Sequence, residues 1–97
     1  MAIQSSEEFM KICRQQVVNY FNEHVDTTDK NQISFEDTYV TYYGKSLQNH
    51  KCLVSTTVPD GMYYECTYNG DKDELYLDVY KKWENKCISF AEKKASE

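Results

Sequence analysis

The chain has 97 residues, a length that suits one domain with one modest core. Its content of 40% hydrophobic and 14% aromatic residues excludes a disordered chain. Its net charge of -5 argues against general affinity for nucleic acid, which needs a basic surface, and permits binding to a basic partner.

No apolar run approaches the roughly 20 residues of a membrane span. The opening residues, MAIQSSEEF, lack the basic and then apolar layout of a signal peptide, so we expect a cytoplasmic protein. The four cysteines lie far apart, with no C-x-x-C pair and no cluster with histidine: Cys13, Cys52, Cys66 and Cys87. We therefore expect free thiols that act as small core residues, with no disulfide, metal site or cofactor.

Residues 6–24 are predicted to form an amphipathic helix. Ser5 and Glu8 match a capping box, and polar residues from Asp26 to Gln32 end the pattern. Apolar and aromatic residues recur at spacings of three and four, which indicates one stripe on a helix. The stripe is Phe9, Ile12, Cys13, Val17, Tyr20, Phe21 and His24. A single capped helical turn is expected at residues 33–37, where Ser34 faces Asp37.

Four segments rich in β-branched and aromatic residues follow: 39–47, 50–58, 62–68 and 74–81. Turn signals separate them at Gln48-Asn49, at Pro59-Asp60-Gly61 and at Asn69-Gly70. The pattern predicts an α+β fold in two layers, with one N-terminal amphipathic helix packed on a four-stranded antiparallel meander sheet. A single domain should span residues 1–97, with its core at about 5–90 and a frayed tail at 91–97. Residues 83–90 fit either a helical turn or a short fifth strand.

The predicted hairpins assign the strand residues to two faces. A two-residue turn at Asn69-Gly70 places Tyr64 opposite Leu75, and a tight turn after Val58 places Val54 opposite Cys66. The face expected to receive the helix is Val40, Tyr42, Cys52, Val54, Met62, Tyr64, Cys66, Leu75, Leu77 and Val79. The other face is Tyr39, Thr41, Tyr43, Leu53, Ser55, Tyr63, Glu65, Thr67, Tyr76, Asp78 and Tyr80. A shift of one residue would exchange the two sets.

The second face is the main candidate for a partner-binding surface. Its proposed contacts are Tyr39, Tyr43, Leu53, Tyr63, Tyr76 and Tyr80. Tyrosine is enriched at the centres of protein interfaces because it gives a large, rigid contact at low entropy cost. Two other interpretations stay open. In one, tyrosine suits any solvated strand, and in the other, the segment with Trp83 and Phe90 folds over part of this face. Stacking of single-stranded nucleic acid would need basic neighbours, whereas the neighbours here are Glu65 and Asp78.

Acidic residues suggest a second, weaker candidate. An acidic rim able to imitate a phosphate array would include Asp60, Asp71, Asp73 and Glu74. The alternative is a solvated hairpin tip with loose ion binding. Residues 26–37 also resemble a calcium loop, but Lys30 stands in fifth place and Asn31 replaces the glycine of sixth place. A loop between helix and strand explains the same residues, so no calcium site is expected.

Catalytic motifs are missing from the sequence. It has no glycine-rich phosphate loop, no G-x-S-x-G and no H-E-x-x-H. The only histidines are His24, at a helix end, and His50, at a strand turn, and no pattern brings either one to a cysteine. We therefore expect no enzymatic activity and assign no catalytic residue.

Residues 47–85 resemble a family of small uncharacterised proteins of bacteriophages and prophages of Gram-positive bacteria. The most specific pieces are STTVPDGMYYE (Ser55–Glu65) and YNGDK (Tyr68–Lys72), and the similarity covers roughly residues 7–88. The family has no established activity, so no functional residue can be carried over. The resemblance implies a phage or prophage origin and a location in the cytoplasm of an infected cell. Such accessory proteins are often inhibitors or adaptors.

The functional hypothesis is a non-enzymatic protein-binding module that acts as an inhibitor or adaptor on host or phage machinery, such as a defence or replication component. One alternative is a small metal-dependent enzyme or nuclease accessory. Another is a homodimer that buries its tyrosine-rich sheet face. Nucleic acid and membrane are not expected as partners.

Overall fold

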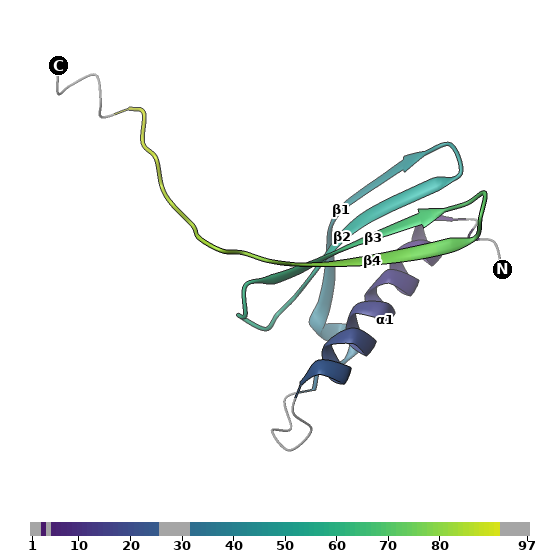
Figure 1. The fold of residues 1–97 in the computed structure, drawn as a ribbon, viewed down its shortest axis with the longest axis horizontal. Coiled ribbons are helices and arrows are strands. Elements are labelled where there is room, and N and C mark those ends of the chain that lie inside the picture. Colours follow the sequence, from purple (N-terminus) through teal and green to yellow (C-terminus); the bar gives the residue numbers. More distant parts are fainter. Residues whose placement is uncertain (1–2, 4, 26–31, 92–97) are drawn as a thin grey trace.

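The computed structural model describes residues 3, 5–25 and 32–91, and it confirms the predicted α+β fold (Figure 1). The elements are α1 (Ser6–His24), the 3-10 turn η2 (Phe35–Asp37), β1 (Thr38–Ser46), β2 (Asn49–Thr56), β3 (Met62–Asn69) and β4 (Glu74–Lys81). The strands form one antiparallel sheet in the order β1-β2-β3-β4. Helix α1 lies on one face of the sheet, and no other described element covers the opposite face.

Local signals explain where α1 begins and which side it buries. The Glu8 N–H donates to Ser5 Oγ at 3.1 Å, which caps the first turn. Phe9, Cys13 and Val17 follow at a spacing of four and are fully buried against the sheet. The core that they enter also contains Cys52, Val54, Tyr64, Cys66 and Tyr68.

Arg14 ties the middle of α1 to the start of the sheet. Its guanidinium lies 3.8 Å from the centre of the Phe35 ring and donates hydrogen bonds to the Phe35 carbonyl and to both the hydroxyl and the carbonyl of Thr38. These bonds satisfy backbone groups where η2 passes into β1. The predicted capped turn is present, because the Asp37 carboxylate accepts the Ser34 N–H at 2.8 Å. Half of the segment that resembles a calcium loop, residues 26–31, lies outside the described residues.

A β-bulge in β1 overturns part of the predicted face assignment. Val40 pairs with Val54, but Tyr42 pairs with the next residue back, Leu53, so Thr41 is an extra residue in β1. From this point each β1 residue takes the face opposite to the predicted one. Tyr43, predicted on the outer face, lies beneath α1, whereas Tyr42 is 55% exposed on the outer face.

The other hairpins differ in register from the prediction but keep their faces. Cys66 pairs with Cys52 rather than Val54, a shift of two residues, and Tyr64 pairs with Val79 rather than Leu75, a shift of four. Because side chains alternate with a period of two, even shifts leave every residue on its predicted face.

The longer turn between β3 and β4 accounts for the shift of four. Asn69 pairs with Glu74, so residues 70–73 form the loop. The Asn69 side-chain oxygen accepts the N–H groups of Asp71 at 3.0 Å and Lys72 at 3.2 Å, which stabilises the wider turn. Gly70 lies against the turn between β1 and β2, where an added Cβ would stand 2.3 Å from the Gln48 carbonyl oxygen.

Residues 82–91 leave the sheet instead of forming the expected helical turn or fifth strand. The last ladder bond runs from the Lys82 N–H to the Gly61 carbonyl at 2.6 Å, and the chain then leads away from the domain (Figure 1). Trp83 is 92% exposed, and Ile88 and Phe90 are also exposed. This segment therefore does not cover the outer face of the sheet. Among the described residues there is no helix with the length and apolarity that a membrane crossing requires.

Candidate interaction face and buried thiol cluster

The uncovered side of the sheet forms a surface that we call the tyrosine face. It consists of Tyr39, Tyr42, Leu53, Tyr63, Tyr76 and Tyr80. The five tyrosines are between 39% and 55% exposed, and Leu53 is half-buried. Five of the six residues proposed for partner binding therefore lie here, and Tyr42 stands where Tyr43 was expected. No described element shields these rings from a partner.

One row of side chains crosses all four strands of this face. Tyr42 pairs with Leu53, Leu53 with Glu65, and Glu65 with Asp78. Beside this row, the Tyr63 and Tyr80 rings stack at a centroid distance of 5.1 Å. The row therefore passes from an aromatic and apolar half on β1 and β2 to an acidic half on β3 and β4.

The acidic half contains a like-charge pair. Glu65 and Asp78 are direct cross-strand partners, an arrangement that destabilises a sheet unless a cation intervenes. Lys51 approaches Glu65 at 3.4 Å, and within the described part of the chain no ion pair reaches Asp78. The Glu65 charge is the first cause of a raised pKa at Tyr80, so this phenol stays protonated at neutral pH. The pair leaves a negative potential next to exposed aromatic rings.

Tyr43 has a structural position under the helix. Its hydroxyl lies 2.7 Å from Nδ1 of His50, and both rings contact Phe9. Burial lowers the pKa of His50 and raises that of Tyr43, so both groups are neutral at physiological pH. No pattern in the sequence predicts this contact, because strict alternation places Tyr43 and His50 on different faces.

The four residues of the predicted acidic rim do not form one group. Asp60 lies at the turn between β2 and β3, whereas Asp71, Asp73 and Glu74 lie at the turn at the opposite end of the sheet (Figure 1). Each carboxylate also accepts a hydrogen bond within the chain. The donors are the Met62 N–H for Asp60, Gln48 for Asp71, the Tyr68 hydroxyl for Asp73 and the Tyr76 hydroxyl for Glu74. The arrangement gives no continuous phosphate-like array.

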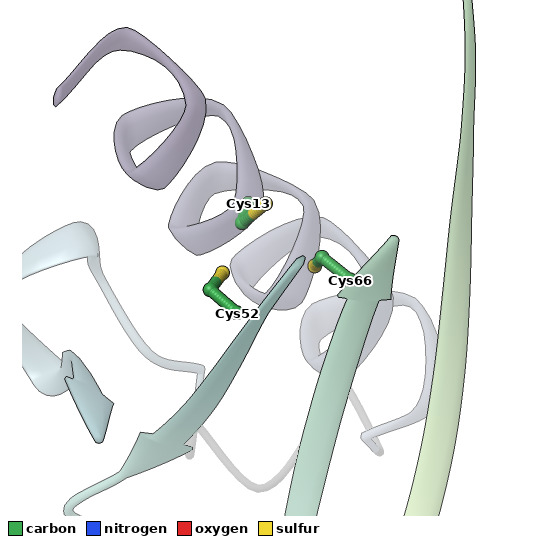
Figure 2. A group of neighbouring side chains, drawn as sticks. All are labelled: Cys13, Cys52 and Cys66. Carbon is green, nitrogen blue, oxygen red and sulfur yellow. The ribbon is translucent and has the colours of Figure 1, made fainter. Parts of the chain in front are cut away.

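Three of the four cysteines meet between the two layers. Figure 2 shows Cys13 on α1, Cys52 on β2 and Cys66 on β3 as neighbours between the helix and the sheet. The three Sγ atoms lie within 4.8 Å of one another, and all three residues are fully buried. The fourth, Cys87, is exposed in the segment after β4. We call the three buried residues the thiol cluster.

Mutual hydrogen bonding sets the protonation of the thiol cluster. Hydrogen bonds from Cys13 and Cys66 lower the pKa of Cys52, and the bond to Cys52 is the first cause of a raised pKa at Cys13. Neither histidine joins this group in the described part of the chain: His24 stacks on Tyr20 near the end of α1, and His50 contacts Tyr43.

The fold and these two features define a small α+β domain with an open aromatic sheet face and a buried trio of thiols. The chain belongs to a family of unknown function (DUF6275), whose model matches residues 10–90. No curated protein matches the chain, and no solved structure does. Membership of this family assigns no role to any residue.

Proposed function

We propose that this protein is a non-enzymatic protein-binding module that docks its partner on the tyrosine face. The observation that carries the proposal is the set of five exposed tyrosines on a sheet face that no described element covers. Tyrosine rings of this kind supply the anchors of many protein interfaces. A tyrosine that only solubilised a strand would not need four neighbours of its kind on one face.

The charges of the face favour a particular partner chemistry. Glu65 and Asp78 oppose each other beside the Tyr63–Tyr80 stack, so a lysine or arginine placed between them would relieve their repulsion. Residues 1–78 carry 13 acidic and 6 basic side chains, which attracts a basic surface over a longer range. The partner is therefore a polypeptide segment that presents basic side chains flanked by apolar or aromatic ones.

A second copy of the chain fits this face less well than a different protein. A symmetric dimer through the tyrosine face would bring the same surface patch of both copies together. If the two-fold axis runs across the strands, Glu65 and Asp78 of one copy approach the acidic half of the other, with added repulsion. If the axis runs along the strands, they approach Tyr42 and Leu53, which carry no charge to relieve the repulsion. Under this proposal the module acts in the cytoplasm as an inhibitor or adaptor, and its resemblance to phage and prophage proteins favours a component of host or phage machinery as the target.

Isothermal calorimetry with designed peptides tests the proposal. The first peptide alternates lysine or arginine with aromatic and aliphatic residues, and the second replaces every basic residue with glutamate. The first should bind the native protein and lose at least tenfold in affinity to the variant Tyr42→Ala/Tyr63→Ala/Tyr76→Ala. The control is Leu47→Ala, because Leu47 is exposed at the turn between β1 and β2, away from the tyrosine face.

Thermal unfolding of both variants checks that they fold. Equal binding of the two peptides, or equal affinity of the triple variant and the control, would contradict the proposal. Sedimentation at micromolar concentration adds the test for self-association. A dimer that becomes a monomer in the triple variant would assign the face to a second copy instead of another protein.

A further inference from the structure

The geometry of the thiol cluster resembles that of a metal site. Three sulfur atoms from three different elements lie within 4.8 Å of one another (Figure 2). Three thiolates around one ion, with metal–sulfur bonds of about 2.3 Å, would stand about 4 Å apart. The cluster therefore needs only a small contraction to surround an ion. We propose that Cys13, Cys52 and Cys66 bind a single soft, thiophilic metal ion in a three-coordinate thiolate site.

The convergence of the three residues is more specific than packing requires. Cys52 and Cys66 are direct partners across β2 and β3, and Cys13 reaches them from α1. Small apolar residues would fill the same space, and the rest of the core is aromatic or aliphatic around them, with Phe9, Val17, Val54 and Tyr64. Three of the chain's four sulfhydryl groups therefore lie together in one part of the core.

The ligand set decides which ions fit. Thiolates favour soft ions such as Cu⁺ and Zn²⁺ over Mg²⁺ and Ca²⁺, which prefer oxygen. Structural zinc sites take four protein ligands, and among the described residues no fourth histidine, cysteine or carboxylate joins the cluster. An open catalytic position is excluded because all three cysteines are fully buried. Cu⁺ suits the site because it accepts three sulfur ligands. Zn²⁺ suits it because its larger positive charge cancels more of the charge of the thiolates.

Charge balance explains why an ion would be retained. The buried polar or charged residues of the described chain are Thr38, His50 and Thr56, so no lysine or arginine is buried beside the cluster to neutralise thiolates. A metal ion would offset part of their burial cost, because Zn²⁺ cancels two of the three negative charges and Cu⁺ cancels one. Each thiol that becomes a ligand releases its proton, so binding weakens as the pH falls.

The position of the site couples the ion to the fold. Its ligands join α1 to the two central strands, β2 and β3, so a bound ion would hold the two layers together. Because the cluster is fully buried, the ion must enter during folding or when α1 detaches from the sheet. Incubation of the folded protein with metal should therefore load it slowly, and refolding in the presence of metal should load it completely.

The test is to refold the reduced protein anaerobically with Zn²⁺ in one arm and with Cu⁺ in the other. The protein is then passed through gel filtration in a buffer that contains a weak chelator. Elemental mass spectrometry measures the metal content of the protein peak. The native protein should hold about one ion per chain, and Cys52→Val, which stays apolar and is only somewhat larger, should hold at least tenfold less. Cys87→Ser is the matched control, because Cys87 is exposed outside the cluster, and it should bind like the native protein.

Proton release by the native protein provides a measurement that does not depend on the variant. Loading in weak buffer should release about three protons per ion, one for each thiol. Comparing the metal content of the protein refolded with Cu⁺ and the protein refolded with Zn²⁺ shows which of the two ions the site binds. Failure to retain either ion, or equal retention by Cys52→Val, would overturn the proposal and would leave the cysteines as small core residues. Neither result bears on the peptide binding of the tyrosine face.

Discussion

Glu65 on β3 and Asp78 on β4 are direct cross-strand partners on the exposed side of the sheet, next to the stacked rings of Tyr63 and Tyr80. Lys51 pairs with Glu65 alone, so the second like charge, on Asp78, lowers the stability of the isolated domain. Surfaces that bind a partner often keep features that are unfavourable in the free protein and become favourable in the complex. The pair therefore links the stability of the domain to the chemistry of its proposed partner.

Replacing Asp78 with asparagine should stabilise the domain and weaken binding. Loss of the opposed charges should raise the free energy of unfolding by about 0.2–1 kcal/mol, as measured with urea. The same change should lower the affinity for the basic peptide, because the partner's cation loses one of its two carboxylates. Glu36→Gln is the control, since Glu36 is exposed in η2, away from the sheet face. A destabilised Asp78→Asn protein with unchanged peptide affinity would count against this explanation of the pair.

The β-bulge predicts different effects of the same substitution at two neighbouring tyrosines. Tyr43→Phe leaves Nδ1 of buried His50 without its partner and should cost about 1–3 kcal/mol of stability. Tyr42→Phe removes an exposed hydroxyl and should change stability by less than about 0.5 kcal/mol. Urea unfolding of both variants measures the difference. Equal effects, or a larger one at Tyr42, would mean that β1 follows the regular register without the bulge.

How far the sequence predicts this fold depends on whether the signals are local. The extent of α1 follows from its cap at Ser5 and its stripe at spacings of three and four, both of which lie within the helix itself. The faces of β2, β3 and β4 were also predicted correctly, although the register was not. The bulge at Thr41 depends on the pairing of β1 with β2, so the residues of β1 alone do not predict it.

The thiol cluster shows the same limit. The sequence placed Cys13 on the buried stripe and Cys52 and Cys66 on the face toward the helix, so all three were on the correct side. Their convergence needed the Cys52–Cys66 pairing, whereas the predicted turn paired Cys66 with Val54. The scattered acidic rim could have been foreseen, because alternate turns of a meander lie at opposite ends of the sheet and Asp60 belongs to a different end from the other three.

Gly44 and Gly70 both lie near the turn between β1 and β2, but replacing each with alanine should change the stability by different amounts. At Gly70 a Cβ would stand 2.3 Å from a backbone oxygen of Gln48, which cannot move without shifting the turn. Gly70→Ala should therefore cost about 1–3 kcal/mol. At Gly44 the nearest atom is the hydroxyl oxygen of Tyr42, at 2.8 Å, which lies at the end of an exposed side chain. Gly44→Ala should cost less than Gly70→Ala in thermal or urea unfolding, and the reverse order would refute the close approach of the two turns.

Stability should fall in mildly acidic solution because His50 is buried. Burial is the first cause of its lowered pKa, with the charge of Lys45 second, so the native state resists the proton that the unfolded state accepts at about pH 6.5. The contribution is therefore complete above this pH and is lost as the pH falls through the lower native pKa. Urea midpoints between pH 8 and pH 5 should decline for the native protein. The urea midpoint of His50→Gln should decline less over the same pH range. If the two proteins gave the same pH profile, His50 would not be the source of the decline.

Mapping the peptide contact by nuclear magnetic resonance tests the central claim most directly. Amide signals of the labelled protein should be followed while the basic, aromatic peptide is added. We predict that the shifted signals cluster at Tyr42, Leu53, Glu65 and Asp78, with those of Gln15 and Asn19 on the exposed side of α1 unchanged. Shifts confined to α1, or no shifts at peptide concentrations that saturate in calorimetry, would contradict the assignment of the tyrosine face as the docking surface.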